Sequence, residues 1–290
     1  MGFRLAAFAD EAGPSVEEQI RALREERIPL VELRGVDGRG ADTLSEQEAA
    51  ALRVRLEENG LRVWSLGSPF GKTGIREPFG PAFDAFRRGL DVARALGTAH
   101  LRLFSFYIPA GEDPHVYRDE VMERLTRFAE AARGSGVTLC HENEKGIYGD
   151  IAVRCEQIHR AVPELRAVFD PANFIQCGQE TPAAWALLEP YVEYFHVKDA
   201  MPDGTVVPAG RGAGHLAELL RDYRGETLTL EPHLYDFSGL SSLEQDGART
   251  QAAGAYGDAR ASFGAAAAAL RALLEEIGRP EAETTKGKEE

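Results

Sequence analysis

Four short apolar runs of the sequence each end in side chains of the kinds that bind metal ions or transfer protons. The runs span residues 137–144, 165–173, 192–199 and 228–233, and near their ends stand Glu142, Asp170, His196 and Glu231. Each run has the pattern of a buried strand whose last residues turn polar, and helical or loop segments separate the runs. The carboxyl ends of parallel strands in an α/β fold face one mouth, where ligands bind. We therefore expect these four side chains to converge.

Three carboxylates and one imidazole form a donor set for a divalent cation. Taken singly, an acidic residue at a strand end is more commonly a salt-bridge partner or a helix cap. Four such residues at strand ends need a shared partner, because removing an unpaired charge from water costs on the order of several kcal/mol. The mostly oxygen ligands favour Mn2+, Mg2+ or Co2+, and carboxylate–histidine sites also suit Zn2+. The sequence thus predicts a divalent metal at this mouth.

The rest of the chain has the pattern of a scaffold of eight strand–helix repeats. Strands are expected to begin near residues 4, 30, 61, 100, 137, 165, 192 and 228, and an Ala-rich final helix to end near residue 277. Capping boxes at Ser15–Glu18 and Ser45–Glu48 mark two helix starts. Repeats without a composition break predict an α/β fold, a (β/α)8 TIM barrel, formed by a single domain over residues 1–278. An open doubly wound sheet is the alternative, but no glycine-rich fingerprint follows the first strand.

Composition narrows the function classes. The 290 residues carry a formal net charge of −14, which opposes binding to a nucleic-acid backbone but not to a small anion. Three cysteines without a CxxC pair imply no disulfide framework, so a reduced cytoplasm is the expected location. The apolar start, interrupted by Asp10 and Glu11, is too short for a signal peptide, and no run of about 18 apolar residues predicts a membrane span. Residues 279–290 have no apolar anchor and are expected to form a disordered tail.

Four motifs carry a resemblance to a known family. They are His141–Lys145 (HENEK), Phe169–Phe174 (FDPANF), Phe195–Asp199 (FHVKD) and Leu230–His233 (LEPH). They resemble those of the sugar phosphate isomerase/epimerase family of xylose isomerase-like TIM barrels, over roughly residues 3–278. The resemblance implies one divalent metal held by Glu142, Asp170, His196 and Glu231, with the two glutamates also acting as acid and base. The ketose 3-epimerases of this family place a histidine three residues after the metal aspartate, whereas this chain has Asn173, whose amide can still hydrogen-bond a hydroxyl.

The expected chemistry is removal of a proton next to a carbonyl group. Chelation of the carbonyl oxygen and a neighbouring hydroxyl by a metal stabilises the enediolate that forms. Glu142 and Glu231 are the candidates for taking and returning the proton. Return to the opposite face gives an epimer, return to the neighbouring carbon gives an isomer, and loss of a β-hydroxyl gives dehydration. We expect a metal-dependent isomerase or epimerase of a small sugar or sugar phosphate in carbohydrate metabolism, with a dehydratase of a sugar-like or cyclitol substrate as the alternative.

Further residues are expected to face the mouth by the alternation of side chains along strands. The predicted substrate-binding residues are Lys198, His233, Arg102, Asn173 and Lys145. Lys198 is equally compatible with an ion pair to a mouth carboxylate, and His233 with a hydrogen bond to a metal ligand. His141 is one residue out of phase and is expected to face the helices. The glycine-rich Gly210–Gly214 has the composition of a phosphate cradle or of an ordinary barrel loop.

Two further function classes remain as alternatives. A related apurinic endonuclease needs a histidine-rich site for several metals and a basic groove, whereas this acidic chain has seven histidines, few of them at strand ends. A sugar-binding protein without turnover is the other alternative, and the intact pair of glutamates argues against it. A small sugar-like molecule is therefore the expected partner, without nucleic acid or membrane, and a homo-oligomer is compatible with this class of barrel.

Overall fold

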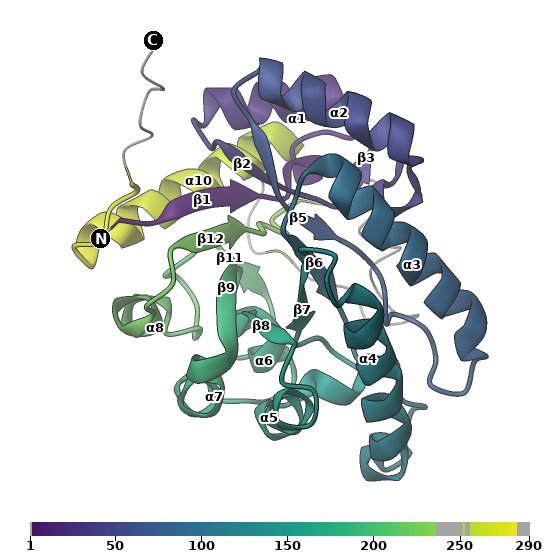
Figure 1. The fold of residues 1–290 in the computed structure, drawn as a ribbon. Coiled ribbons are helices and arrows are strands. Elements are labelled where there is room, and N and C mark those ends of the chain that lie inside the picture. The colour runs from purple at the N-terminus through teal and green to yellow at the C-terminus, as the bar shows by residue number, and fades with distance from the viewer. Residues whose placement is uncertain (1, 236–251, 253–255, 283–290) are drawn as a thin grey trace.

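The computed structural model describes residues 2–235, 252 and 256–282. Eight parallel strands close into a barrel in the order β1–β2–β5–β6–β7–β8–β9–β12 (Figure 1). They are β1 (Arg4–Ala7), β2 (Leu30–Leu33), β5 (Arg62–Gly67), β6 (His100–Leu103), β7 (Thr138–Glu142), β8 (Arg166–Phe169), β9 (Val192–Val197) and β12 (Thr227–Leu230). The predicted (β/α)8 barrel of a single domain is confirmed.

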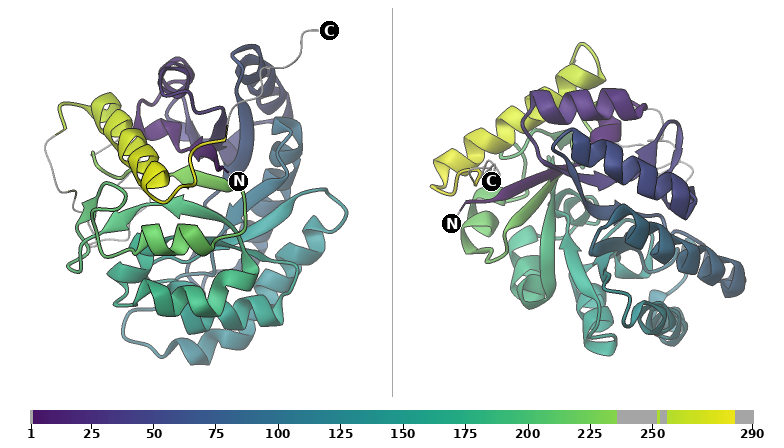
Figure 2. Two further views of the ribbon diagram at one scale, coloured as in Figure 1. Left: turned by 90° about the vertical axis from the view of Figure 1, so that its left-hand side faces the viewer. Right: turned by 45° about the horizontal axis from the view of Figure 1, so that its top comes forward.

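Helices form the outer layer around this barrel (Figure 2). They are α1 (Val16–Glu25), α2 (Glu46–Glu58), α3 (Phe79–Leu96), α4 (Arg118–Ala132), α5 (Ala152–Ala161), α6 (Pro171–Gln176), α7 (Thr181–Leu188), α8 (Leu216–Asp222) and α10 (Ala259–Glu276). Both predicted capping boxes are present, because Ser15 and Ser45 each exchange hydrogen bonds with the glutamate three residues later. Helix α3 ends at Gly97, whose φ of 72° is accessible to glycine at little cost.

Short elements fill the connections between strands and helices. Two antiparallel hairpins pair β3 (Gly35–Val36) with β4 (Arg39–Gly40), and β10 (Asp199–Ala200) with β11 (Val206–Val207). The short 3-10 turns are η1 (Ala9–Glu11), η2 (Ala41–Thr43), η3 (Pro114–Tyr117), η4 (Tyr148–Asp150) and η5 (Glu189–Tyr191). The turn η1 follows β1, the hairpin of β3 and β4 follows β2, and the hairpin of β10 and β11 follows β9. All three therefore lie at the mouth of the barrel, where the strands have their carboxyl ends.

Side chains alternate between the helix layer and the barrel interior along each strand. On β9, Phe195 and Val197 belong to the main hydrophobic core, whereas Tyr194 packs in a separate small cluster with Cys140 and Val168. His196 is in phase with Tyr194 and is fully buried. The strands therefore place their apolar residues against the helices and leave polar residues to line the upper barrel.

The first residues of the expected disordered tail, residues 279–282, are bound to the rest of the protein. Arg279 donates hydrogen bonds to the carbonyls of Leu220 and Tyr223, and its guanidinium lies 4.0 Å from the ring centroid of Phe3. Phe3 N donates to Pro280 O at 3.1 Å, and Ala282 N donates to Phe3 O at 2.8 Å. Residues 279–282 thus pack beside β1, and the predicted start of the tail at residue 279 is too early. Residues 283–290 lie outside the described residues.

Most of the segment between β12 and α10 lies outside the described residues, namely 236–251 and 253–255. Ala252, which is described, pairs with Val206 of β11. Within the described part of the chain, every helix is too short or too polar to cross a membrane.

Candidate metal centre and active site

The structure brings the four residues at the strand ends together at the carboxyl end of the barrel. Glu142 is the last residue of β7, His196 lies in β9, and Asp170 and Glu231 directly follow β8 and β12. One ligand atom from each lies within 4.8 Å of those from the other three, and all four side chains are buried. A parallel barrel brings them together because all its strands end at one mouth. The expected convergence is therefore present, while binding of a metal stays a prediction.

The donor atoms of this cluster fit a divalent metal. Glu142 Oε2 and Asp170 Oδ2 are buried and accept no hydrogen bond from the residues that the structure describes. They are instead approached by cations, with Arg102 Nη1 at 3.1 Å from the first and Lys198 Nζ at 2.8 Å from the second. Carboxylate oxygens and an imidazole nitrogen are ordinary ligands of divalent cations. The set that would hold the metal is Glu142, Asp170, His196 and Glu231.

The pKa values of Asp170 and His196 are shifted because several carboxylates are buried close together in the cluster. Burial raises the pKa of Asp170 to about 7, even though Lys198 acts in the opposite direction. Burial disfavours the charged imidazolium of His196, but the surrounding glutamates outweigh this effect and raise its pKa well above the ordinary value. The centre of the cluster therefore favours positive charge, as a cation site requires.

Three cations lie against the carboxylates of the cluster. Lys198 Nζ is 2.8 Å from Asp170 Oδ2 and 3.0 Å from Glu231 Oε2, the ion pairing that the sequence left open for this lysine. Arg102 pairs with Glu142, and Arg34 Nη1 lies 3.3 Å from Glu231 Oε1. Of these, Lys198 and Arg102 were predicted to bind substrate, and both lie at the cluster.

Asn173 lies beside two of the predicted ligands. Its backbone N donates to Asp170 Oδ1 at 2.9 Å, so Asp170 caps the N-terminus of α6. Its side-chain Nδ2 donates to Asn143 O at 2.9 Å and to Glu142 Oε1 at 3.4 Å. Asn143 in turn exchanges two hydrogen bonds with the backbone of Asp170, at 2.9 and 3.0 Å. These amides fix the positions of Glu142 and Asp170 relative to each other.

His233 and Lys145 occupy different parts of the mouth. His233 Nε2 lies 3.4 Å from Glu231 Oε1 and 3.4 Å from Glu11 Oε1. This position agrees with the alternative given for His233, contact with a predicted metal ligand. Lys145 is half-buried and contributes, with Lys72 and Lys198, to lowering the pKa of Glu144 against the effect of burial. His233 is therefore placed at the cluster itself, and Lys145 beside Glu144.

A second group of possible ligands consists of Glu11, Glu231 and His233. Arg34 already brings positive charge to this group, because its Nη2 lies 3.1 Å from Glu11 Oε1 and its Nη1 lies 3.3 Å from Glu231 Oε1. Arg34 also forms an ion pair with Asp10 at 2.9 Å. From the sequence, Arg34 was assigned no role, because its partners follow strands that are distant in the sequence.

The loop that follows β5 carries a lysine to the mouth of the barrel. Its backbone pairs with the end of β6, where Phe104 N donates to Phe70 O at 2.8 Å and Tyr107 N donates to Thr73 O at 2.9 Å. This pairing places Lys72 Nζ 3.1 Å from Glu144 Oε2 and 4.5 Å from the ring centroid of Phe104. Lys72 is thus a mouth residue that the sequence analysis did not single out.

His141 lies outside the cluster, as its phase on the strand indicated. Its Nε2 is 3.0 Å from Ser105 Oγ, and its ring packs 5.9 Å from that of His159. Burial lowers its pKa well below the ordinary value, with a further contribution from His159. His141 is therefore a neutral core side chain between the barrel and the helices.

The glycine-rich loop binds a carboxylate of its own chain. Asp199 accepts hydrogen bonds from the backbone N–H groups of Gly210, Gly212 and Gly214 at 2.9–3.0 Å, and from that of Ala200 at 2.9 Å. A Cβ at Gly212 or Gly214 would lie 2.4 or 2.6 Å from Asp199 Oδ1. These amides are engaged, so the alternative of a structural barrel loop holds and the phosphate cradle is wrong.

Replacing Asp199 by Ala should lower the free energy of unfolding by on the order of 3 kcal/mol, because it leaves two buried and two partly buried N–H groups without their charged acceptor. Denaturant unfolding monitored by circular dichroism measures this change. The exposed Asp203 accepts one hydrogen bond, from Thr205 N in the same hairpin, and Asp203→Ala is the matched control with an expected change within about 0.5 kcal/mol. Equal stabilities of the two variants would contradict the role given to Asp199.

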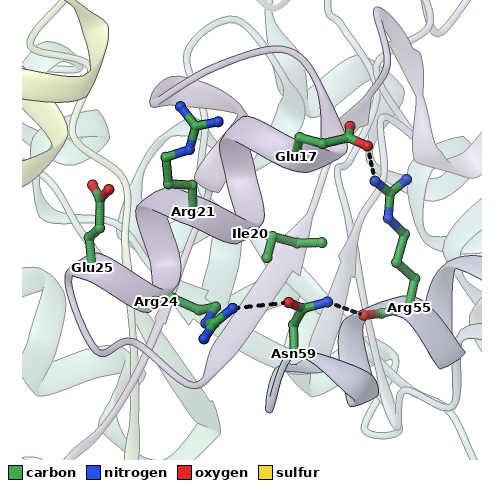
Figure 3. A pocket seen from close by; sticks show the side chains of 7 residues that line it. All are labelled: Glu17, Ile20, Arg21, Arg24, Glu25, Arg55 and Asn59. Carbon is green, nitrogen blue, oxygen red and sulfur yellow. Dashed lines mark hydrogen bonds and ion pairs between the residues drawn. The ribbon is translucent and has the colours of Figure 1, made fainter.

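A groove of about 550 Å³ lies on the outer surface between α1 and α2 (Figure 3). Two polar contacts join its sides: Glu17 forms an ion pair with Arg55, and Arg24 Nη1 donates to Asn59 Oδ1 at 3.3 Å. The groove is lined by residues of these two outer helices and the turn after α2, and none of the predicted site residues contributes to it. The chemistry therefore belongs to the barrel mouth and not to this groove.

Comparisons with solved structures agree with this architecture. IOLI protein with a bound zinc atom superimposes with a TM-score of 0.72 at 12% identity, covering 94% of this chain and 99% of the other. The probable 3-DHS dehydratase AsbF from Bacillus anthracis gives 0.69 at 15% identity, covering 93% and 98%. D-psicose 3-epimerase from Clostridium cellulolyticum H10, solved with D-tagatose, gives 0.69 at 15% identity, covering 96% and 100%. At these identities the likeness establishes the fold alone.

The sequence itself identifies the family. No curated protein matches the chain. A family model described as xylose isomerase-like TIM barrel matches residues 21–263, which is most of the chain and includes all four residues of the buried cluster. The chain therefore belongs to the xylose isomerase-like TIM barrel family.

Proposed function

We propose that the protein is a divalent-metal-dependent isomerase or epimerase that acts on a small sugar or sugar phosphate through an enediolate. The observation that carries the proposal is the placement of two glutamates around one imidazole nitrogen. His196 Nδ1 lies 2.9 Å from Glu142 Oε1 and 3.4 Å from Glu231 Oε2. Glu142 ends β7 and Glu231 follows β12, with β8 and β9 between them in the barrel, so the two carboxylates flank the cluster from different sides. A pair placed in this way suits removal of a proton on one side of a substrate and its return on another.

The metal, when bound by the four ligands, supplies positive charge that stabilises the negative charge developing on the substrate oxygen. One of the two glutamates, Glu231 or Glu142, removes the proton from the substrate with its carboxylate. The other glutamate returns a proton to the substrate. Burial opposes ionisation of Glu231, but Lys198, His233 and His196 outweigh it and lower the pKa well below the ordinary value. Glu231 is therefore available in the ionised form that a base needs.

The substrate is expected to lie between the cluster and the loop that carries Lys72. Lys198, His233 and Arg102 offer N–H donors beside the two glutamates, and the amide of Asn173 reaches the same space. Lys145 offers a further cation beside Glu144. The backbone hydrogen bonds between this loop and the end of β6 hold Lys72 beside Glu144 at the mouth.

The proposed cofactor is one divalent ion, with Mn2+, Mg2+ or Co2+ favoured and Zn2+ also suitable. Three of the four ligands are carboxylates, which hard cations prefer. The imidazole of His196 keeps Zn2+ among the candidates, as does the zinc atom of the structurally similar IOLI protein.

A dehydratase of a sugar-like or cyclitol substrate is the second candidate. Asn173 stands where the 3-epimerases of the family have a histidine, and its amide is bound to Asn143 and Glu142. Loss of a β-hydroxyl from the same enediolate needs the same first proton transfer, so both candidates use Glu142 and Glu231.

Solvent deuterium incorporation tests the proposal. The Mn2+-treated protein is incubated in D2O with ketoses, aldoses, inososes and their phosphates; the metal is then removed by a chelating resin and the products are followed by NMR. We expect deuterium next to a carbonyl of one compound class, and no incorporation when the chelator is present from the start. A new epimer or isomer supports the first candidate, and an enone supports the second. Absence of exchange across the panel, with metal bound, would count against both.

A further inference from the structure

We propose that Glu32, held by Tyr194, is a positioning residue that orients His196 so that its Nδ1 faces the metal site. The inference rests on the proposed metal centre and assigns a role to residues that lie below it. Glu32 Oε2 lies 3.1 Å from His196 Nε2, and Tyr194 donates its hydroxyl hydrogen to Glu32 Oε1 at 2.8 Å. All three side chains are fully buried.

The imidazole of His196 has two nitrogens with different surroundings. Its Nδ1 faces the carboxylates of Glu142 and Glu231 at 2.9 and 3.4 Å. Its Nε2 faces Glu32 in the barrel interior. A carboxylate that accepts the N–H of Nε2 selects the tautomer whose lone pair is on Nδ1, which is the form that binds a metal through Nδ1.

The position of Glu32 depends on the barrel strands around it. Glu32 lies on β2 beside Ser65 of β5, where the register of the two strands shifts between Val31 and Glu32. Ser65 Oγ is 3.2 Å from the hydroxyl of Tyr194, which lies on β9 two residues before His196. Both oxygens of Glu32 are thus engaged, one by Tyr194 and one by His196, so its carboxylate has one stable orientation.

Glu32 is placed to act through His196 and not on substrate. It is not among the residues whose ligand atoms gather in the metal cluster. Within the part of the chain that the structure describes, its carboxylate hydrogen-bonds Tyr194 and His196. Loss of such a hydrogen-bonded carboxylate behind a metal-binding histidine typically costs about 10–100-fold in metal affinity.

The test is Mn2+ affinity, measured from free Mn2+ by electron paramagnetic resonance without any substrate. In Glu32→Gln, the acidic oxygen facing Nε2 is replaced while Tyr194 still has an oxygen to donate to, so the amide NH2 group is expected to face the imidazole. A comparable carboxylate-to-amide change behind the histidine of a serine protease gives the wrong tautomer. We expect a Kd for Mn2+ about 10–100-fold weaker than that of the wild type. Tyr194→Phe, which removes only the support of Glu32, should weaken binding in the same direction by a smaller factor.

Glu193→Gln is the matched control. Glu193 Oε1 also accepts a hydrogen bond from a histidine, His100 Nε2 at 3.1 Å, but that histidine begins β6 at the opposite end of the barrel. The control should leave the Kd unchanged. The 15N NMR signals of His196 in the Mg2+-loaded protein give a second readout, which a general loss of packing would not produce: the wild type should carry its proton on Nε2, and Glu32→Gln should show this tautomer destabilised.

The outcomes separate this inference from the proposed function. Wild-type protein that binds no Mn2+ at all would overturn the metal centre and the positioning role with it. Wild-type binding together with an unchanged Kd in both Glu32→Gln and Tyr194→Phe would overturn the positioning role alone. Glu32→Asp, which keeps the charge on a shorter side chain, should bind Mn2+ more tightly than Glu32→Gln. If Glu32→Gln folds poorly, the Kd of Tyr194→Phe decides the matter, and a wild-type Kd in that variant would overturn the positioning role.

Discussion

Glu231→Gln and Glu142→Gln should each lower the rate of product formation by about 10²–10⁴-fold, the range typical of losing a general acid or base. An amide cannot take a proton from carbon at neutral pH, while its size and shape match those of the carboxylate. The fold should survive, because Arg34 keeps its ion pairs with Asp10 and Glu11, and Lys198 keeps its ion pair with Asp170. The measurement is turnover by NMR with the compound identified in the deuterium experiment, at saturating metal.

The control for these variants is again Glu193→Gln, which removes a carboxylate from the opposite end of the barrel. It should turn over at the wild-type rate. Circular dichroism spectra and metal affinities of all three variants show whether a loss of rate has another origin. If either Glu142→Gln or Glu231→Gln were fully active, the assignment of that residue as acid or base would be wrong.

The second large effect is expected for Asp170→Asn. A metal that binds only the folded state, at a thousandfold excess over its Kd, adds about 4 kcal/mol to the free energy of unfolding. For a chain of this size this corresponds to a rise in the thermal midpoint of about 10 °C. Asp170→Asn removes one charged ligand and should abolish most of this rise. The metal-free variant should still fold, because asparagine is also a good N-cap for α6 and keeps an oxygen for Asn173 N.

Differential scanning calorimetry with and without Mn2+ measures both effects. Asp203→Asn, an exposed change in the hairpin of β10 and β11, is the control and should show the full rise. A rise in Asp170→Asn equal to that of the wild type would show that the metal binds elsewhere.

The positions of the candidate ligands were predictable because they follow from a local pattern. Each stands near the end of an apolar run, and parallel strands of one barrel end at one mouth, so this rule placed Glu142, Asp170, His196 and Glu231 together. A second rule, the alternation of side chains along a strand, separated His141 from them.

The contacts of Glu32 could not be predicted, because they depend on which strands face one another across the barrel. Glu32 contacts Tyr194 and His196 across the barrel interior, 162 and 164 residues away in the sequence. No local pattern on β2 identifies that partner. The glycine-rich loop illustrates a different difficulty, because its N–H groups suit any anion and the structure supplies the carboxylate of Asp199. Arg279 was missed because its anchors are backbone carbonyls and one aromatic ring, not apolar neighbours in the sequence.

The most direct test of the central claim is a crystal structure of the protein with Mn2+, with anomalous scattering data collected to locate the ion. The account predicts one strong peak within about 2.5 Å of a ligand atom from each of Glu142, Asp170, His196 and Glu231. His196 should face the peak through Nδ1, with Nε2 remaining on Glu32. A peak between Glu11 and His233, or no peak in the barrel mouth at a concentration that saturates Mn2+ binding in solution, would contradict it.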